Sequence, residues 1–370
     1  MWRQGLLLAA LLSLPAFADS PRVLALLPNG NGATIFALVV DKIVAVPIDA
    51  SGASHAERAV TLWRDVAEYP SFGIDRTTAG YMMAISDHLQ IVWATPLRGD
   101  FSAIAQPRAY GSGYFSSLAC HDDVCAAAHN GAGLVNHPTL RVIDEAASPL
   151  ANSPIDPNQG GLVATDDGGF ALLLRLSAPS QGQLVLQFFD RAGHLTATST
   201  VATRNGTENF NFYGVSIAPH PLGVAVFWPD GPQVAAAIVR TDGVVIARAA
   251  FVAPDIEVSS VRVAHGAGQY GLKVTTVVEP GFYVPQNPNN RAPTVASNVM
   301  RVSDSLSLLE SPVRVGDFSD GITAADDAFF ALIFDGAYRL LRIPYTGPIK
   351  ASSSKLLDFA PLVRRRTASR

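Results

Sequence analysis

Three pairs of acidic residues recur in this sequence at the ends of short apolar runs. They are Asp122-Asp123, Asp166-Asp167 and Asp326-Asp327. Calcium prefers carboxylate oxygens as ligands, so pairs at corresponding positions could form a ring of ion sites. Each pair stands in a turn too short to surround an ion, however, and Asp is itself a favoured turn residue. We therefore assign these pairs to turns and expect neither a bound metal nor a cofactor.

Histidines form a second group of residues that could carry chemistry, as acids, bases or metal ligands. The candidates are His121, beside an acidic pair, His129 and His137, around a Gly/Asn-rich stretch, and His220 and His265, in two corresponding turns. None of them belongs to a nucleophile, zinc-protease, phosphate-loop or dinucleotide motif. The sequence does not decide whether the protein is an enzyme, and it favours a non-catalytic one.

The two cysteines, Cys120 and Cys125, lie close together in SLACHDDVCAAA. Cys120 ends one predicted strand and Cys125 begins the next, so the two face each other across a tight hairpin at a plausible bridging distance. The alternatives are a redox pair or a metal site, but C-x4-C with one His lacks the remaining zinc ligands. We predict a structural disulfide worth about 2 kcal/mol, because the loop that it closes is short.

The elements that position these residues are clearest between Leu162 and Thr203. Four short apolar runs are separated there by an Asp-Asp-Gly-Gly turn, a Pro/Ser/Gly turn and a DRAG turn. Runs of this length between turn residues predict strands of one antiparallel sheet. We use this unit as the template for the rest of the chain.

The template repeats. An apolar run that meets a polar residue, with Gly three positions later, marks the turn before the fourth strand at Gly52, Gly99, Gly193, Gly243 and Gly347. Ala147 and Ser307 occupy the corresponding positions in the other two units, although Gly is expected where a hairpin needs a positive φ. The turn between the first two strands gives a second marker, and both markers define seven units of about 47 residues.

Seven units of four short strands predict an all-β fold, a seven-bladed β-propeller of four-stranded antiparallel blades. Stacking the units around an axis buries the apolar faces that one unit cannot bury alone. Two stacked β-sandwich domains are the competing architecture. Helical periodicity is nearly absent, and the strongest helical candidate is the stretch HAERAVTLWRDVAEY. The predicted propeller domain covers 19–362, with blades at about 22–63, 72–108, 114–150, 160–203, 212–253, 258–315 and 319–360.

The first 18 residues have the pattern of a signal peptide. A positive charge in MWR precedes an apolar run, Gly5 to Leu14, that is too short to span a bilayer, and Ala16-Phe17-Ala18 fits a cleavage site. The sequence therefore predicts a secreted or periplasmic protein without a transmembrane segment after cleavage. Residues 363–370 are predicted to form a basic flexible tail.

Composition narrows the possible partners. The net charge of -4 and the pI of about 6.0 give no reason to expect nucleic acid. Only four of the 27 basic residues are lysines, a bias typical of GC-rich bacterial genomes. We expect a bacterial protein that is a monomer.

The strand endings resemble those of a loose group of secreted bacterial β-propeller-like repeat proteins. In that group the second strand ends in an aromatic residue plus Asp, as in VAVFWPDG (Val224 to Gly231), and the third ends in an Asp-x-x-Gly hairpin. The resemblance covers nearly the whole mature chain and implies the propeller fold, but the group has no single activity to transfer.

One unit departs from the template by an insertion, Glu279 to Val295, rich in Pro and Asn. Long loops inside compact domains are usually functional or disordered. In a propeller this loop shares a face with the loops that join blades, and that face is the usual ligand face. The predicted ligand-binding residues are Phe282, Tyr283, Asn287, Asn289, Asn290 and Arg291 in the insertion, with Phe210 and Phe212 in a joining loop.

Two functions fit these residues, and a structural envelope component, which would show no pocket, is a third reading. The first is a non-catalytic binding propeller that recognises a protein or a glycan through the face carrying residues 279–295. The alternative is a secreted propeller hydrolase or lyase that acts on polysaccharide with acidic and His residues at the central channel. A convergent Asp/Glu/His set in a pocket on that face would favour the enzyme.

Overall fold

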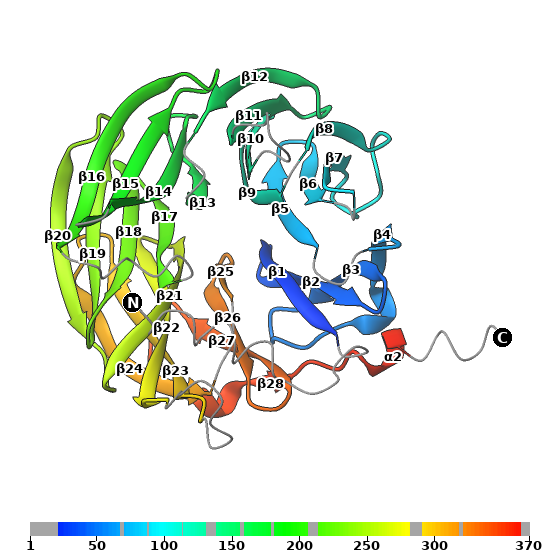
Figure 1. Ribbon diagram of the computed structural model, residues 1–370. Helices are drawn as coiled ribbons and strands as arrows, with labels where there is room; N and C mark the ends of the chain where they lie inside the picture. The colour runs from blue at the N-terminus through cyan, green and yellow to red at the C-terminus, as the bar shows by residue number, and fades with distance from the viewer. Residues whose placement is uncertain are drawn as a thin grey trace.

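The structure is a computed structural model of the chain. It describes residues 21–66, 70–86, 89–112, 114–130, 138–155, 159–178, 181–205, 214–281, 291–317 and 321–363. Their strands form seven four-stranded antiparallel sheets, each built from four strands consecutive in sequence. The sheets stand side by side in a ring around a central opening (Figure 1). The predicted seven-bladed β-propeller is therefore confirmed, and the arrangement is not that of two stacked sandwiches.

The first four blades are built as follows. Blade 1 contains β1 (Arg22–Asn29), β2 (Gly32–Val39), β3 (Lys42–Ile48) and β4 (Val60–Arg64). Blade 2 contains β5 (Ser71–Thr77), β6 (Gly80–Ser86), β7 (Ile91–Leu97) and β8 (Arg108–Ser112). Blade 3 contains β9 (Tyr114–His121), β10 (Val124–Asn130), β11 (Thr139–Asp144) and β12 (Pro149–Pro154). Blade 4 contains β13 (Gln159–Ala164), β14 (Phe170–Ala178), β15 (Gln181–Phe189) and β16 (Leu195–Asn205).

The remaining three blades follow the same order. Blade 5 contains β17 (Ser216–His220), β18 (Gly223–Asp230), β19 (Gln233–Arg240) and β20 (Val245–Val252). Blade 6 contains β21 (Glu257–Gly266), β22 (Gln269–Glu279), β23 (Thr294–Ser303) and β24 (Leu308–Gly316). Blade 7 contains β25 (Ile322–Ala324), β26 (Ala328–Phe334), β27 (Tyr338–Pro344) and β28 (Lys355–Leu356).

The core of the protein lies between the blades. Each pair of neighbouring blades shares a cluster of buried apolar side chains, including the pair formed by blades 7 and 1. The middle strands are buried on both faces: every residue of β2 is buried, and so is every residue of β18 except Asp230. Burying one Val, Leu, Ile or Phe side chain contributes about 1.5–3 kcal/mol, so the contacts between blades hold the ring together.

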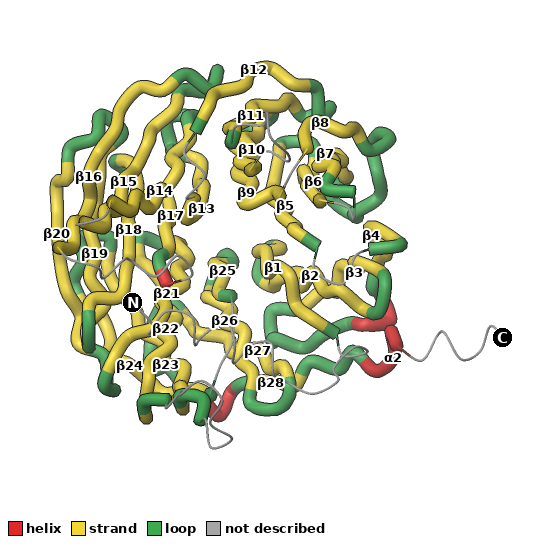
Figure 2. The backbone as a smooth tube through the Cα atoms, in the orientation of Figure 1, coloured by secondary structure: helices red, strands yellow, loops and turns green. Residues whose placement is uncertain are grey.

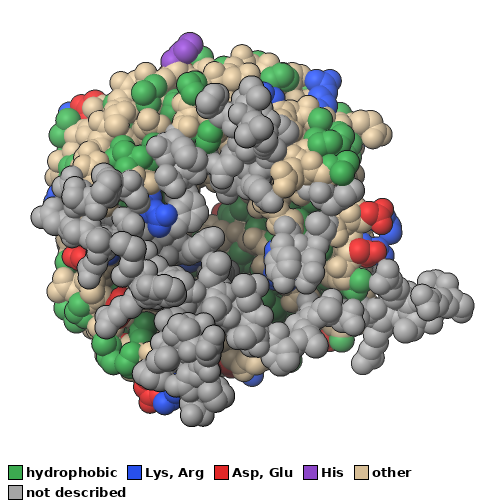
Figure 3. All heavy atoms as spheres, in the orientation of Figure 1, with side chains coloured by type: hydrophobic (Ala, Val, Ile, Leu, Met, Phe, Trp, Pro, Cys, Tyr) green, Lys and Arg blue, Asp and Glu red, His purple; other side chains and the backbone are tan. Residues whose placement is uncertain are grey.

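The two ends of the ring carry different connections, and Figure 2 draws these loops and turns in green between the strands. We call the loop face the end that carries the connections from second to third strands and from one blade to the next, for example 230–233 and 253–256. The turn face is the opposite end, which carries the first-to-second and third-to-fourth strand turns, for example 29–32 and 240–245. Figure 3, viewed along the ring axis, shows the surface hollowed at the centre of the ring.

The third-to-fourth strand turns use a left-handed residue, as the sequence predicts, but not always at the predicted position. Gly52, Gly193, Gly243 and Gly347 have φ of 83–86°, and Ala147 adopts 59° in place of a glycine. In blade 2 the left-handed residue is Phe101 (φ 65°), two residues after Gly99. In blade 6 it is Leu306 (φ 59°), one residue before Ser307. The geometry of the turn is therefore kept even where glycine is missing.

The strongest helical candidate of the sequence does not form a long helix. Its described part is a single 3-10 turn, η1 (Ala56–Arg58), followed by β4. The β-branched and aromatic residues of VTLWR pair with β3, which outweighs the helix propensity of the flanking Ala and Glu. The other short helical elements are η3 (Ala351–Ser353) and α2 (Ala360–Val363). Within the described ranges no helix is long and apolar enough to cross a membrane.

The cysteines form the predicted disulfide. Cys120 in β9 and Cys125 in β10 are direct cross-strand partners, and the bond joins them with a Cα–Cα distance of 4.0 Å. On the inner side, the Cys120 backbone N–H donates to Oδ2 of Asp75 in β5, at 2.8 Å. The hairpin of blade 3 is thus tied both to itself and to blade 2.

The ring closes by side-chain packing. Blade 1 is built entirely from the first strands and blade 7 entirely from the last, so no sheet contains strands from both ends of the chain. The apolar cluster at this junction joins β2 and β3 to Phe330, Leu332 and Leu340. Two polar contacts add to it: Lys355 Nζ lies 2.8 Å from Ser51 Oγ, and the N–H of Asp326 donates to the carbonyl of Gly30.

Candidate ligand-binding site

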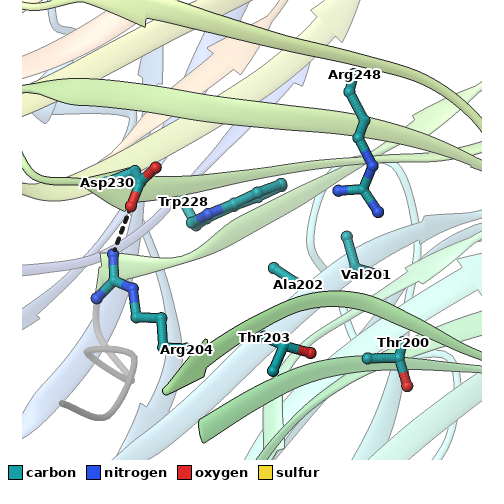
Figure 4. Close-up of a pocket in the computed structure, with 8 residues that line it drawn as sticks. All are labelled: Thr200, Val201, Ala202, Thr203, Arg204, Trp228, Asp230 and Arg248. Carbon is teal, nitrogen blue, oxygen red and sulfur yellow. Dashed lines mark hydrogen bonds and ion pairs between the residues drawn. The ribbon is translucent and has the colours of Figure 1, made fainter. Parts of the chain in front are cut away.

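A pocket of about 290 Å³ lies between blades 4 and 5, on the outer part of the ring. Figure 4 shows the eight residues that line it: Thr200, Val201, Ala202, Thr203, Arg204, Trp228, Asp230 and Arg248. Five of them come from β16, two from β18 and one from β20. The pocket therefore draws on the outermost strands of two neighbouring blades and on the second strand of blade 5.

A β-bulge shapes the wall that β16 provides. Leu184 of β15 pairs with Ala202 whereas Val185 pairs with Thr200, so Val201 is the extra residue. Val201 is fully buried in the cluster between blades 4 and 5. Because a bulge shifts the in–out alternation of a strand, Thr200 and Thr203 are both left exposed beside the pocket.

Strand β18 supplies the floor and one end of the pocket. Val226, Trp228 and Asp230 alternate along one face of the strand, since side chains repeat every two residues. Trp228 is 6% exposed and packs in the same cluster as Val201. Asp230, at the loop-face end of the strand, is exposed.

The charged residues of the pocket are arranged asymmetrically. Arg204 and Asp230 lie at one end and Arg248 at the other, with Trp228 between them (Figure 4). The Arg204 guanidinium donates to Asp230 Oδ1 at 3.3 Å and to the carbonyl of Pro229. No residue in the described ranges forms an ion pair with the exposed Arg248 guanidinium. The pocket thus contains Arg204, which is ion-paired, and Arg248, which has no ion pair in the described ranges. It also contains two Thr hydroxyls and the indole ring of Trp228.

This arrangement suits binding rather than bond breaking. The lining residues include one carboxylate and no histidine. Arginine cannot act as a general base near neutral pH, because its pKa stays above about 12. Arginine does bind carboxylate groups through two parallel hydrogen bonds, and Thr hydroxyls both donate and accept. The pocket can therefore hold a polar or acidic ligand.

Most of the ligand-binding residues predicted from the sequence lie outside the described residues: Phe210, Phe212, Phe282, Tyr283, Asn287, Asn289 and Asn290. Arg291 is described. It is exposed and forms an ion pair with Glu279 across the base of the insertion, where Thr294 Oγ1 also lies 3.5 Å from the same carboxylate. The insertion joins β22 to β23 on the loop face, the end at which the pocket holds Arg204 and Asp230.

The turn face brings together a second polar group, which we call the histidine cluster: His220, His265, Tyr270 and Asp304. Nε2 of His265 lies 2.8 Å from Oδ1 of Asp304, and the rings of His265 and Tyr270 are 4.8 Å apart. Nδ1 of His220 accepts the backbone N–H of Leu222 at 3.0 Å. The corresponding turns of blades 5 and 6 therefore do place two of the candidate histidines near one carboxylate.

Burial shifts the pKa of two residues of the histidine cluster, His220 and Tyr270. It lowers the pKa of His220, an effect that His265 reinforces and that the Asp304 and Asp166 carboxylates, with a backbone hydrogen bond to Asp304, oppose. It also raises the pKa of Tyr270, whose hydroxyl has no hydrogen-bond partner among the described residues. His220 is buried at 6% exposure and Tyr270 completely, so this cluster is packed into the fold.

Most of the other candidates from the sequence lie in turns on the same face, whereas His129 is a buried residue of β10 and His137 lies outside the described residues. Arg191 forms ion pairs with Asp122 and Asp123, and Nδ1 of His121 lies 3.2 Å from Asp122. Asp167 accepts bonds from Thr165 Oγ1 and the Gly169 N–H, and Asp327 pairs with Arg342 at 2.7 Å. The described residues contain no group of three or more His, Cys, Asp or Glu side chains that could hold a metal ion. The acidic pairs therefore occupy turns, as predicted.

The pocket residues were not predicted from the sequence, although two signals point to them. Trp228 and Asp230 belong to VAVFWPDG, the motif that carries the family resemblance. Arg248 is the single charged residue in the otherwise apolar strand VIARAAFV. A single charged residue on an outer strand does not by itself predict a site, because the opposite wall of the pocket comes from the neighbouring blade.

The fold and its inter-blade pocket define the chain as a seven-bladed β-propeller. Among solved structures it is similar to Sqt1 of Saccharomyces cerevisiae, with a TM-score of 0.54 and 12% identity over 90% of this chain and 85% of Sqt1. It is also similar to a prolyl endopeptidase, with a TM-score of 0.53 and 12% identity over 95% of this chain and 53% of that protein. The chain thus spans about half of the endopeptidase. Identities this low show a common fold.

No family model matches the sequence, and no curated protein matches it. The resemblance to bacterial propeller-like proteins is confirmed for the propeller fold, while secretion and bacterial origin stay predictions.

Proposed function

We propose that the protein is a non-catalytic binding propeller that recognises a protein or a glycan through its loop face. The observation that carries this proposal is the pocket between blades 4 and 5, which combines Trp228, two arginines and two Thr hydroxyls without a histidine. Aromatic rings with nearby polar groups are typical of binding sites for small or extended ligands. The pocket holds Arg204 and Asp230 at the loop-face end, the end that carries the insertion predicted to bind ligand.

The alternative, a polysaccharide hydrolase or lyase with acid and His residues at the central channel, has less support. The His220, His265 and Asp304 side chains lie on the turn face, away from the pocket. Their polar atoms bond to one another or to the backbone, and His220 is buried. A general base must reach the proton of a bound substrate. The contacts of His220, His265 and Asp304 leave little of these side chains exposed to a substrate.

We propose that this binding takes place outside the cytoplasm, in the periplasm or after secretion, and that the protein acts as a monomer. The predicted signal peptide supports the location, and the Cys120–Cys125 disulfide is compatible with it, since disulfides persist in oxidising compartments.

Deleting Phe282 to Ala292 from the full chain tests the role of the insertion. We expect nearly unchanged thermal stability, because β22 and β23 on either side of the insertion stay paired in blade 6. We also expect loss of binding on a glycan array and in partner capture, because the deletion removes the residues predicted to bind ligand. The control is His194→Gln, at an exposed turn-face residue, which should keep all binding. Retained binding after the deletion would contradict ligand recognition by the insertion, and loss of folding would show that it is structural.

A further inference from the structure

The outer strand of blade 5 has one buried and one exposed face. Ala247, Ala249 and Phe251 pack into the cluster between blades 5 and 6. The alternate residues, Arg248, Ala250 and Val252, are exposed, with Val252 at 66%. Together with the exposed Ile246, Ala250 and Val252 form a row of exposed apolar residues along one strand, and contiguous apolar surface of this kind marks a candidate interaction surface.

The exposed face of β20 points towards blade 4. Arg248 pairs with Ala237, and Ala250 pairs with Ala235. Both alanines belong to the cluster between blades 4 and 5, and cross-strand partners share a face. Arg248 and residues 200–204 of β16 line one pocket, so blade 4 leaves a space on this face between β16 and β20. We call this space the rim groove and define it by exposed residues along the two strands: Thr200, Thr203, Arg248, Ala250 and Val252.

The rim groove is closed at the turn face and open towards the loop face. At the closed end Gly243, with φ of 86°, packs against β16, and a Cβ added there would lie 3.3 Å from the Thr198 carbonyl oxygen. Towards the other end lies the pocket that has Trp228 at its floor, beside β20, a strand of eight residues.

The walls of the rim groove are edge strands. In the described residues β16 pairs only with β15, and β20 pairs only with β19. Each strand therefore presents a free edge of backbone N–H and C=O groups, which is a template for another extended polypeptide. A peptide strand satisfies such an edge through its own backbone, whereas a glycan has no regular pattern of amide groups to match.

The positive charge of Arg248 favours peptides that carry an acidic residue. Arg204 is compensated by Asp230, which leaves Arg248 as the open cation of the rim groove. A carboxylate accepts two parallel hydrogen bonds from a guanidinium, the strongest pairing open to it. Residues two and four positions away on the same face of a bound strand would meet Ala250 and Val252, which favours apolar side chains there.

From these observations we infer that the rim groove binds an extended segment of a partner protein that carries an Asp or Glu opposite Arg248 with apolar residues two and four positions away. This inference rests on the proposed binding function and names the ligand class and its place.

The test begins with a displayed library of random eight-residue peptides panned on the immobilised full chain. We expect enrichment of segments with one acidic residue and apolar residues at alternate positions. An enriched peptide should bind at least about tenfold more weakly when its acid is changed to the amide, because a charge-assisted bond is lost.

The matching variants of the protein are Arg248→Gln and Val252→Glu. Each should weaken the enriched peptide at least about tenfold without lowering the melting temperature, since both side chains are exposed. Arg314→Gln, an exposed arginine on the outer strand of blade 6, is the control and should bind like the wild type.

The outcomes separate the two proposals. Enriched peptides without acidic residues, or an affinity unchanged in Arg248→Gln, overturn the inference. Binding to a glycan array with no peptide enriched also overturns it, but leaves the proposed binding function standing. Failure of peptides, glycans and partner capture alike overturns both.

Discussion

The pocket between blades 4 and 5 and the histidine cluster on the turn face are both polar groups placed where neighbouring elements meet. In the histidine cluster both histidines are bonded within the chain: His265 bonds to Asp304, and His220 accepts a backbone N–H. In the pocket, Arg204 is paired in the same way, whereas the exposed Arg248 has no ion-pair partner among the described residues. Polar side chains thus stabilise the fold in the histidine cluster, whereas Arg248 in the pocket remains able to bind a ligand.

The difference shows where function can be sought in a repeat fold of this kind. Titratable side chains are concentrated in the turns, where they accept backbone N–H groups or bridge neighbouring turns. The pocket instead depends on departures from regular strands, a bulge at Val201 and a lone arginine in an apolar strand. The following predictions compare the two regions, starting with the largest expected effect.

Replacing a half-buried and an exposed histidine tests whether the histidine cluster is structural. His265→Ala should lower the free energy of unfolding by about 1–3 kcal/mol, because it removes a bond to a carboxylate and the packing against Tyr270. His194→Ala should change it by less than about 0.5 kcal/mol, since its ion pair with Asp190 is exposed. Urea denaturation measures both. Equal effects of the two substitutions would break the comparison.

Acid should weaken the turn face through His220. Burial lowers the pKa of His220 in the folded state below its usual 6.5, so the unfolded chain binds the proton more tightly. The stability linked to this residue is therefore present above pH 6.5 and is lost as the pH falls through and below that value. The wild type should lose more stability than His220→Asn between pH 7.5 and 5.5 in urea titrations. Parallel losses in the two proteins would remove His220 as the cause.

The smallest effect is expected at Tyr270. Its hydroxyl is buried without a partner among the described residues, so Tyr270→Phe should be neutral or raise the free energy of unfolding by up to about 1 kcal/mol. Thermal unfolding and binding to the enriched peptide should both be measured. A clear loss of stability would reveal a partner of this hydroxyl, and a loss of binding would assign the histidine cluster a functional role.

The sequence predicts those features of the fold that depend on local chemistry. Strands follow from short apolar runs between turn residues, and the disulfide follows from two cysteines at opposite ends of one hairpin. The position of the left-handed residue is less predictable: Phe101 and Leu306 adopt it instead of the expected Gly99 and Ser307. Glycine favours that conformation without being required for it, since the flanking strands can impose it on another residue.

The candidate site was beyond the reach of local patterns. Thr200 and Arg248 are far apart in sequence, and they share a pocket only because two blades diverge at the rim. Likewise His265 meets Asp304 only after blade 6 has folded. The residues predicted from the insertion and the joining loop lie outside the described residues except Arg291, so their role stays a prediction.

The junction between blades 7 and 1 has a mechanical consequence. Because no sheet contains strands from both ends of the chain, tension applied between residues 22 and 363 acts across the contact of two complete blades. The segment that follows β28 takes part in this contact, since Leu357 and Phe359 belong to the same cluster. Because β28 pairs with β27 at only two positions, a load applied at the C-terminal end first peels β28 away and then reaches the packing between blades 7 and 1.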